Sequence, residues 1–146
     1  MTNKFANRSI SILYRYGQRF FAQELKRRGL SLEVGQMPAL IRICRNPGIT
    51  QEGISANTGM DKGTTARSVK QLEESKLITR CTDKMDRRLN HIYPTKAAED
   101  IYVVLMDIIK DYHALLYEGF SEKEIELAFD LLTRMKENVA KNFCRL

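Results

Sequence analysis

The sequence has few of the residues that build cross-linked, metal-binding or catalytic sites. Its 146 residues include three cysteines, two histidines, three prolines and no tryptophan. Cys44, Cys81 and Cys144 are odd in number and widely spaced, and no pair has the spacing of a zinc or dithiol motif. His91 and His113 lie far apart and beside no catalytic triad or phosphate-binding loop. We therefore expect no disulfide framework, no metal, no cofactor and no enzymatic activity.

Long apolar runs are also missing. No stretch approaches the roughly 20 apolar residues that a membrane-spanning helix needs, and the N-terminus lacks the apolar region of a secretory signal peptide. Scattered cysteines fit a reducing compartment. These features predict a cytoplasmic protein with no membrane partner.

The charge is strongly uneven along the chain. The formal net charge is +6 and the pI about 9.3. Residues 1–90 hold 17 Lys and Arg against 8 Asp and Glu, whereas residues 91–146 hold 7 against 10. A basic excess of this kind favours a polyanionic partner. We expect the first two thirds to contact that partner and the acidic remainder to have another role.

Amphipathic helices are predicted at both ends of the sequence. Apolar residues recur at helical spacing within residues 4–28, and again between Thr95 and Gly119. Ser121 and Glu124 form an S-x-x-E capping box in front of a last apolar run. Such helices cannot bury their apolar faces alone. They need the rest of the chain, a second copy of it, or both.

The middle of the sequence consists of short elements with sharp turns. Thr50 is a candidate N-cap for a helix over residues 51–57, and Asp61 is one for a helix that ends near Ser75. Residues 58–60 make the turn between them, and strand-like segments 77–82 and 89–93 flank a charged turn. The predicted fold is mainly α with a small β-hairpin (α+β): a helix-turn-helix followed by a hairpin wing.

This arrangement predicts a double-stranded DNA interface. The second helix of a helix-turn-helix fits the major groove, and a basic hairpin tip can place an arginine in the neighbouring minor groove. Backbone amides at a helix start also attract phosphate. The predicted contacts are Lys62, Thr64, Thr65, Arg67, Ser68 and Lys70 on the second helix, Lys84, Arg87 and Arg88 in the hairpin turn, and Thr50 and Gln51 at the start of the first helix.

A protein-interaction module is the alternative from a different class, because a basic winged helix can also bind an acidic partner. The hydroxyls and Arg67 on the second helix argue against it, since a helix that binds protein is expected to carry larger apolar anchors. A mobility-shift assay with DNA separates the two hypotheses.

The segment GITQEGISANTGMDKGTTARSVKQLEESKLITR, residues 48–80, resembles the winged-helix core of the MarR (multiple antibiotic resistance regulator) family. The D-R-R of residues 86–88 is similar to that family's wing signature, and Pro94-Thr95 to the start of its fifth helix. Gly53 and Gly63 depart from the family pattern, and glycine inside a helix destabilises it by about 1 kcal/mol. Pro94 stands where leucine is common.

The resemblance implies a single MarR-like domain over residues 1–146. It implies a winged helix-turn-helix DNA-binding lobe over residues 33–93, and dimerisation helices over 4–28 and 95–146. It further implies an obligate homodimer that acts as a repressor on a pseudo-palindromic operator. Arg88 would enter the minor groove and Asp86 would orient it.

The same resemblance implies a small aromatic or anionic effector bound between the dimerisation helices and the winged lobe. The candidate ligand-binding residues are Tyr14, Tyr16, Phe20, Met37 and Arg42, although such a stripe is also typical of a core. Redox sensing through Cys44 or Cys81 is the alternative trigger.

Overall fold

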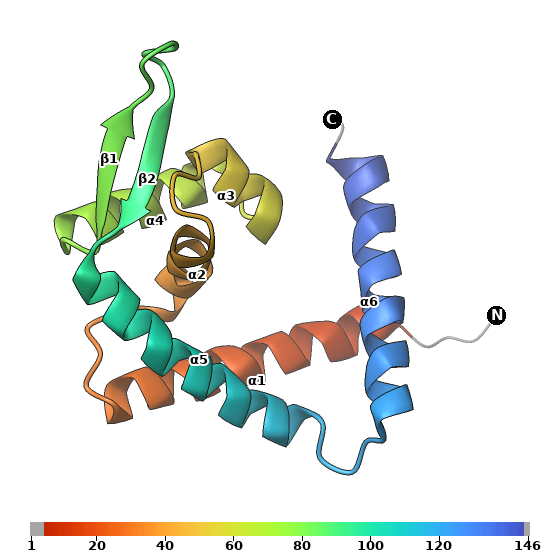
Figure 1. Cartoon of the computed structure of the whole chain (residues 1–146). Helices are drawn as coiled ribbons and strands as arrows, with labels where there is room; N and C mark the ends of the chain where they lie inside the picture. The colour runs from red at the N-terminus through yellow and green to blue at the C-terminus, as the bar shows by residue number, and fades with distance from the viewer. Residues whose placement is uncertain (1–4, 145–146) are drawn as a thin grey trace. The chain divides into compact units, whose positions relative to one another are not determined.

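The structure, a computed structural model, describes residues 5–144 and confirms the predicted mainly helical fold with a small hairpin (Figure 1). Lys4, the first residue of the predicted N-terminal helix, and residues 145–146 lie outside the described residues. The chain divides into two compact units, one up to Ile109 and one from Lys110 onward. None of the described helices is long and apolar enough to cross a membrane.

The first unit begins with α1 (Ala6–Arg27), whose two ends differ in burial. Leu25, near the C-terminal end, belongs to the core at 2% exposure. In the N-terminal half, the apolar and aromatic side chains are exposed, with Tyr14 at 66% and Tyr16 at 60%. The helix therefore packs against its own unit mainly through its second half.

A short 3₁₀ helix, η1 (Val34–Gln36), leads into three helices, α2 (Met37–Arg45), α3 (Gln51–Thr58) and α4 (Lys62–Glu74). The predicted N-caps are confirmed: the side chain of Thr50 accepts a hydrogen bond from the Gly53 amide, and that of Asp61 from the Thr64 amide. Gly59 ends α3 with a φ of 75°, in the left-handed region that favours glycine. Helices α3 and α4 thus form the predicted helix-turn-helix.

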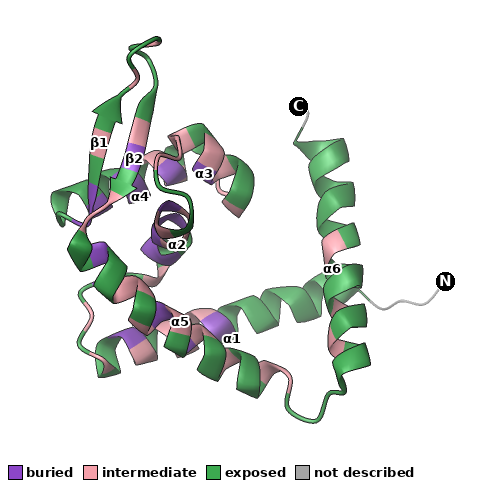
Figure 2. Ribbon diagram, in the orientation of Figure 1, coloured by how far each residue is buried: buried purple, intermediate pink, exposed green. Residues whose placement is uncertain are grey.

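The core of this unit lies among α2, α3, α4, β2 and α5, where Figure 2 shows the buried residues gathered. Side chains from each element are completely buried: Leu40, Ile43, Ile54, Val69, Leu72, Ile92, Leu105 and Ile108. Burying a leucine or isoleucine side chain contributes about 1.5–3 kcal/mol. The core fixes the side of α4 that faces inward, and thereby the side that remains exposed.

An antiparallel hairpin of β1 (Ile78–Thr82) and β2 (Asn90–Pro94) follows α4, in a register that pairs Ile78 with Pro94 and Thr82 with Asn90. The predicted strands each began one residue too early. A short bridge from Ile49 adds the segment before α3 to the free edge of β2. Gly48, in this segment, has a φ of 92°, and an added Cβ would lie 3.3 Å from the Tyr93 hydroxyl. The hairpin is therefore hydrogen-bonded to the start of the helix-turn-helix.

Helix α5 (Lys96–Leu116) belongs to the first unit up to Ile109 and to the second from Lys110. Within the second unit, α5 ends before Gly119 and α6 (Glu122–Phe143) follows. The predicted capping box is present, because the Ser121 hydroxyl accepts from the Glu124 amide and the Glu124 carboxylate accepts from the Ser121 amide. Helix α6 contains no buried residue.

Candidate nucleic-acid interface

Helix α4 has a buried side and an exposed side. Thr65, Ser68, Val69 and Leu72 follow the spacing i, i+3, i+4, i+7 and are all buried. Gly63, Arg67 and Lys70 follow the same kind of spacing on the opposite side and are exposed. Lys62 is exposed in the first turn, and Thr64 is half-buried. The exposed side of α4 therefore carries basic groups around a glycine.

Two of the predicted contact residues lie on the wrong side of this helix. The Thr65 hydroxyl donates to the Asp61 carbonyl at 2.9 Å and lies 2.7 Å from the Ser55 hydroxyl on α3. Ser68, 6% exposed, places its hydroxyl 3.5 Å from the Gly35 carbonyl. Both hydroxyls serve packing between elements, which corrects the expectation that they contact DNA. The helical spacing of Thr65 and Ser68 relative to the apolar Val69 and Leu72 already indicated in the sequence that all four residues share the buried side of α4.

Arg67 lies over the start of α4. Its Nη2 donates to the Thr64 hydroxyl at 3.1 Å, and an added Cβ at Gly63 would lie 3.5 Å from its Nη1. Asp61 caps the helix beneath it, and the hydrogen bonds from Thr64 hold the pKa of that carboxyl below its usual value. The 3.5 Å between that added Cβ and Nη1 is an ordinary van der Waals contact, so the position of the Arg67 guanidinium does not itself require glycine at residue 63.

The turn of the hairpin, residues 83–89, is organised by two carboxylates. Oδ1 of Asp83 accepts from the amides of Met85 and Asp86, at 2.8 and 2.9 Å. Asp86 Oδ1 accepts from the Arg88 amide at 3.0 Å and from Arg88 Nε at 3.2 Å. The Arg88 side chain remains 90% exposed. The turn therefore holds an arginine in the open, with its carboxylate partner two residues before it.

The start of α3 lies next to this turn. Thr50, Gln51 and Glu52 line one surface hollow together with Arg88, Leu89 and Asn90. The Gln51 side-chain oxygen accepts from Arg80 Nη1 at 2.9 Å, and Arg80 Nε pairs with Glu73 of α4 at 3.0 Å. Sequence reasoning missed Arg80, which joins β1, α3 and α4. The structure thus brings Thr50 and Gln51 together with Arg88, as the hypothesis of one interface requires.

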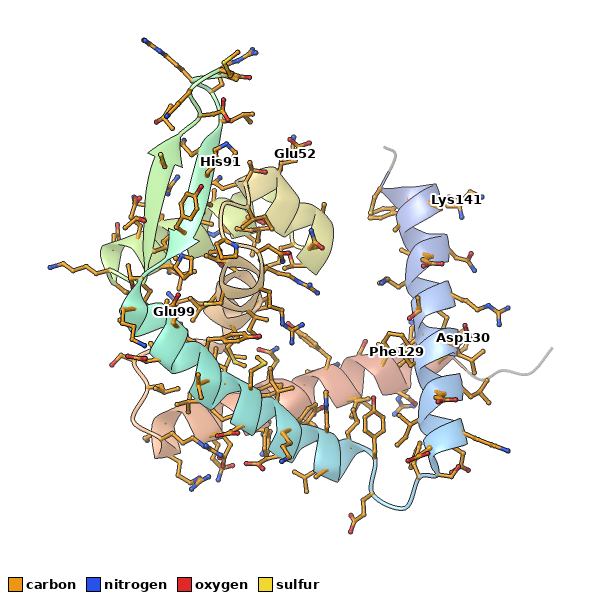
Figure 3. The ribbon with its side chains drawn as sticks, viewed as in Figure 1. Glu52, His91, Glu99, Phe129, Asp130 and Lys141 are labelled. Atoms are coloured by element: carbon orange, nitrogen blue, oxygen red, sulfur yellow. The ribbon has the colours of Figure 1, made fainter. Side chains whose placement is uncertain are left out.

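His91 is a second residue that sequence reasoning did not place in the site. It is the second residue of β2, just below the turn of the hairpin, on the side of α3 (Figure 3). Its Nε2 lies 2.7 Å from Asp83 Oδ2, and its Nδ1 lies 2.8 Å from the Gly48 carbonyl oxygen. The partner at Gly48 is 43 residues away in sequence. Only the Asp83 contact, between residues near each other, offered a sequence signal.

A pocket of about 370 Å³ lies within the first unit, with α1, α2 and the end of α3 in its wall. Of the predicted ligand-binding residues, Met37 and Arg42 line it, whereas Tyr14, Tyr16 and Phe20 do not. Phe20 packs instead against the core, with its ring 5.6 Å from that of Phe21. The pocket is lined by Gln18, Phe21, Val34, Met37, Pro38, Ile41, Arg42, Asn57, Thr58 and Ile109.

The cysteines differ in environment, and all three are free. Burial, and then the nearby Glu99 carboxylate, raise the pKa of the Cys44 thiol to about 11. Cys81 and Cys144 are exposed. Because the thiolate is the reactive form of cysteine, Cys44 is poorly suited to redox sensing.

The chain is similar to known regulators over most of its length. The profile of the MarR family matches residues 23–89. The uncharacterized HTH-type transcriptional regulator YybA of Bacillus subtilis (strain 168) is 30% identical over 114 residues, which are 78% of this chain and 76% of that one.

Solved structures agree with this match. The transcriptional regulator SlyA superposes with a TM-score of 0.89 at 32% identity, covering 95% of this chain and 96% of its own. A MarR family transcriptional regulator from Listeria monocytogenes, complexed with 26mer DNA, gives 0.89 at 30% identity, covering 95% and 91%. Fold, motifs and both kinds of similarity agree, and the chain belongs to the MarR family of transcriptional regulators.

Proposed function

We propose that the protein is a homodimeric repressor that binds a pseudo-palindromic operator with α4 in the major groove and the hairpin turn in the minor groove. The observation that carries this proposal is the exposed, basic side of α4 together with the open Arg88, on one compact unit. The Listeria relative bound to 26mer DNA supports it.

The two contacts have different tasks. Arg67 is suited to a guanine edge, because its planar guanidinium can donate two parallel hydrogen bonds to O6 and N7. Lys62 and Lys70 neutralise phosphates on either side. Arg88, in the minor groove, senses groove width rather than base identity, because a narrow groove has a deeper negative potential. Lys84 and Arg87 add phosphate contacts.

The dimer is supported by the apolar side chains that each unit leaves exposed. They include Phe5, the N-cap of α1, at 73%, Leu13 in α1 at 43%, and Leu132 and Val139 in α6 at 50% and 60%. Long amphipathic helices with no buried face are not stable on their own. A second copy of the chain covers these faces, and its two-fold axis explains a palindromic operator.

The effector is a small aromatic or otherwise apolar anion. Apolar side chains dominate the wall of the 370 Å³ pocket, and Arg42 supplies a cation. Asn57 and Thr58 at the end of α3 lie in the same wall. A ligand there contacts α1, α2 and α3 at once, so its binding energy can shift the helix-turn-helix relative to α1 and release the operator.

The test of DNA binding starts from sequences selected out of random double-stranded DNA. Arg67→Ala and Arg88→Ala should each weaken binding of the selected site by roughly tenfold or more. Arg134→Ala is the matched control, because Arg134 is 68% exposed and paired with Asp130 on α6. The proposal fails if no sequence is enriched, or if the three variants bind alike. An acidic protein partner bound through the same arginines would then favour the interaction module.

The test of the effector uses benzoate as a probe of the chemical class. Benzoate should weaken operator binding by the wild-type protein and have less effect on Arg42→Met. Arg45→Met, on the same helix but outside the pocket, is the control. If benzoate had the same effect on both variants, the effector would not bind in this pocket.

A further inference from the structure

His91 joins two parts of the first unit that are distant in sequence. It lies on β2, where its register partner on β1 is Cys81. One ring nitrogen contacts the carboxylate of Asp83, where the turn of the hairpin begins, at 2.7 Å. The other contacts the carbonyl of Gly48, two residues before the N-cap of α3, at 2.8 Å.

The chemistry of the two partners fixes the protonation state of the ring. A backbone carbonyl has no proton to donate, and neither has an ionised carboxylate. The hydrogen bond from His91, and then those from the amides of Asp86 and Met85, lower the pKa of Asp83 to about 2. Both ring nitrogens must therefore donate, which only the doubly protonated imidazolium can do.

The bridge restrains the part of the hairpin that carries the basic groups. Asp83 uses its second oxygen to hold the amides of Met85 and Asp86, and Asp86 in turn holds Arg88. A connected series of hydrogen bonds thus runs from the Gly48 carbonyl through the imidazolium to the arginine that we place in the minor groove.

We propose that His91 is a cationic positioning residue of the wing: as an imidazolium it fixes the hairpin turn, and with it Arg88, relative to the start of α3. This role rests on the proposed DNA-binding function and goes beyond it, because it makes operator affinity depend on the charge of a residue that does not touch DNA. At high pH the neutral ring retains one N–H and can satisfy only one of its two acceptors.

Other titratable groups lie on the neighbouring elements. They are the Cys81 thiol opposite on β1, Tyr93 on β2, Glu52 in the first turn of α3, and Asp86 and Arg88 in the turn. The pKa of His91 is set by its two hydrogen-bond partners. The hydrogen bond to Asp83, and then that to the Gly48 carbonyl, raise this pKa above its usual value of about 6.5.

The sign of the pH dependence follows from this direction. A group whose pKa is raised in the folded state contributes fully below its unfolded pKa, here about 6.5. That contribution is lost as the pH rises through the higher, folded pKa. Asp83 behaves oppositely, since its contribution is present above about 3.9 and is lost only as the pH falls through about 2. The bridge is therefore complete below about pH 6.5 and opens as the pH rises through the raised pKa of His91.

The first experiment is an NMR titration of the imidazole groups in the protein without DNA. The sequence has two histidines, so His113 serves as the internal reference. His91 should titrate above about 6.5, and Asp83→Asn should lower its pKa. A His91 that titrates at or below that value overturns the bridge.

The second experiment measures affinity for the selected DNA between about pH 6 and pH 9 at constant ionic strength. In the wild type, affinity should fall by about fivefold as His91 loses its proton, the effect of one partly exposed charge-assisted hydrogen bond. His91→Gln should show a flat profile, and His113→Gln should retain the fall. Circular dichroism establishes that each variant is folded, and Asp83→Asn provides a second route to the flat profile.

Arg88→Ala distinguishes positioning from direct attraction. If His91 acts by placing Arg88, the fall in affinity disappears when Arg88 is absent. If the imidazolium simply attracts phosphate, the fall persists in Arg88→Ala, and the positioning role is overturned. DNA binding with no pH dependence overturns only this role, whereas no DNA binding at any pH overturns the proposed function and the role together.

Discussion

The winged lobe of the first unit and helix α6 of the second use apolar residues in opposite ways. In the lobe, Leu40, Ile54 and Leu72 are 0% exposed. In α6, Phe129 is 69% and Leu132 is 50% exposed, and no residue is buried. Both segments have apolar residues at helical spacing, so this spacing alone does not tell which surface covers the apolar face of each helix. The lobe is folded by its own contacts, whereas the apolar face of α6 requires another surface.

The largest expected effect concerns the lobe itself. Ile54→Ala removes a completely buried side chain from α3 and should lower the free energy of unfolding by about 2–5 kcal/mol. Leu127→Ala on α6, where the side chain is 57% exposed, should change it by less than about 0.5 kcal/mol. Urea unfolding of both variants measures the difference. Equal losses would show that α6 is as well packed as the lobe.

The next prediction addresses what covers α6. Leu132→Asp places a charge on the apolar face, formed by Ile125, Ala128, Leu132, Met135, Val139 and Phe143. Dimer affinity should fall by about 100-fold, because an unpaired charge would be buried at the interface. Leu127→Asp makes the same change outside that face. Sedimentation equilibrium distinguishes them, and a parent protein that is already monomeric would contradict the prediction.

A third prediction compares two neighbouring threonines of α4. Thr65→Val removes the buried hydroxyl that binds the Asp61 carbonyl and the Ser55 hydroxyl, and should destabilise the lobe by about 1–2 kcal/mol. Thr64→Val should leave unfolding nearly unchanged and weaken DNA binding. Thermal unfolding and a mobility shift on both variants test the assignment. The opposite outcome would mean that α4 is rotated in solution.

The smallest effect comes from the helix caps of the two regions. Thr50→Ala and Ser121→Ala each remove a hydroxyl that accepts one amide, worth about 1 kcal/mol to its helix. In Thr50→Ala this loss should appear in the unfolding of the lobe. In Ser121→Ala it should appear in hydrogen exchange of the first turn of α6, with lobe unfolding unchanged. A lobe destabilised equally by both would show that the two regions unfold together.

Features that depend on neighbouring residues in the sequence were predictable. The caps at Thr50, Asp61 and Ser121 and the turn at Gly59 were correctly predicted, because each involves residues at most four positions apart. The fold followed from their order. The sequence also indicates which side of α4 faces inward. The hydroxyl groups of Thr65 and Ser68 favoured an interpretation as DNA contacts. Their helical spacing relative to Val69 and Leu72, however, places them on the buried side.

Features that depend on distant residues were not predictable. Nothing near His91 in the sequence indicates the Gly48 carbonyl, and nothing near Arg80 indicates Gln51, 29 residues before it. The pocket is a similar case. Tyr14 and Tyr16 are aromatic residues of the kind that often line a ligand site. The rotation of α1 about its own axis instead places Gln18 and Phe21 in the wall of the pocket.

The segment at Gly48 and Ile49 has a mechanical consequence. It belongs to the five-residue connection, residues 46–50, between α2, which lines the pocket, and α3. The Gly48 amide donates to the Ile92 carbonyl at 2.8 Å, and the Ile92 amide donates to the Ile49 carbonyl at 3.0 Å. A displacement of α2 would therefore be transmitted through this segment both to α3 and to the middle of β2. This connection links the wall of the pocket to both elements of the proposed DNA interface, so a ligand that displaces α2 would act on the two elements together.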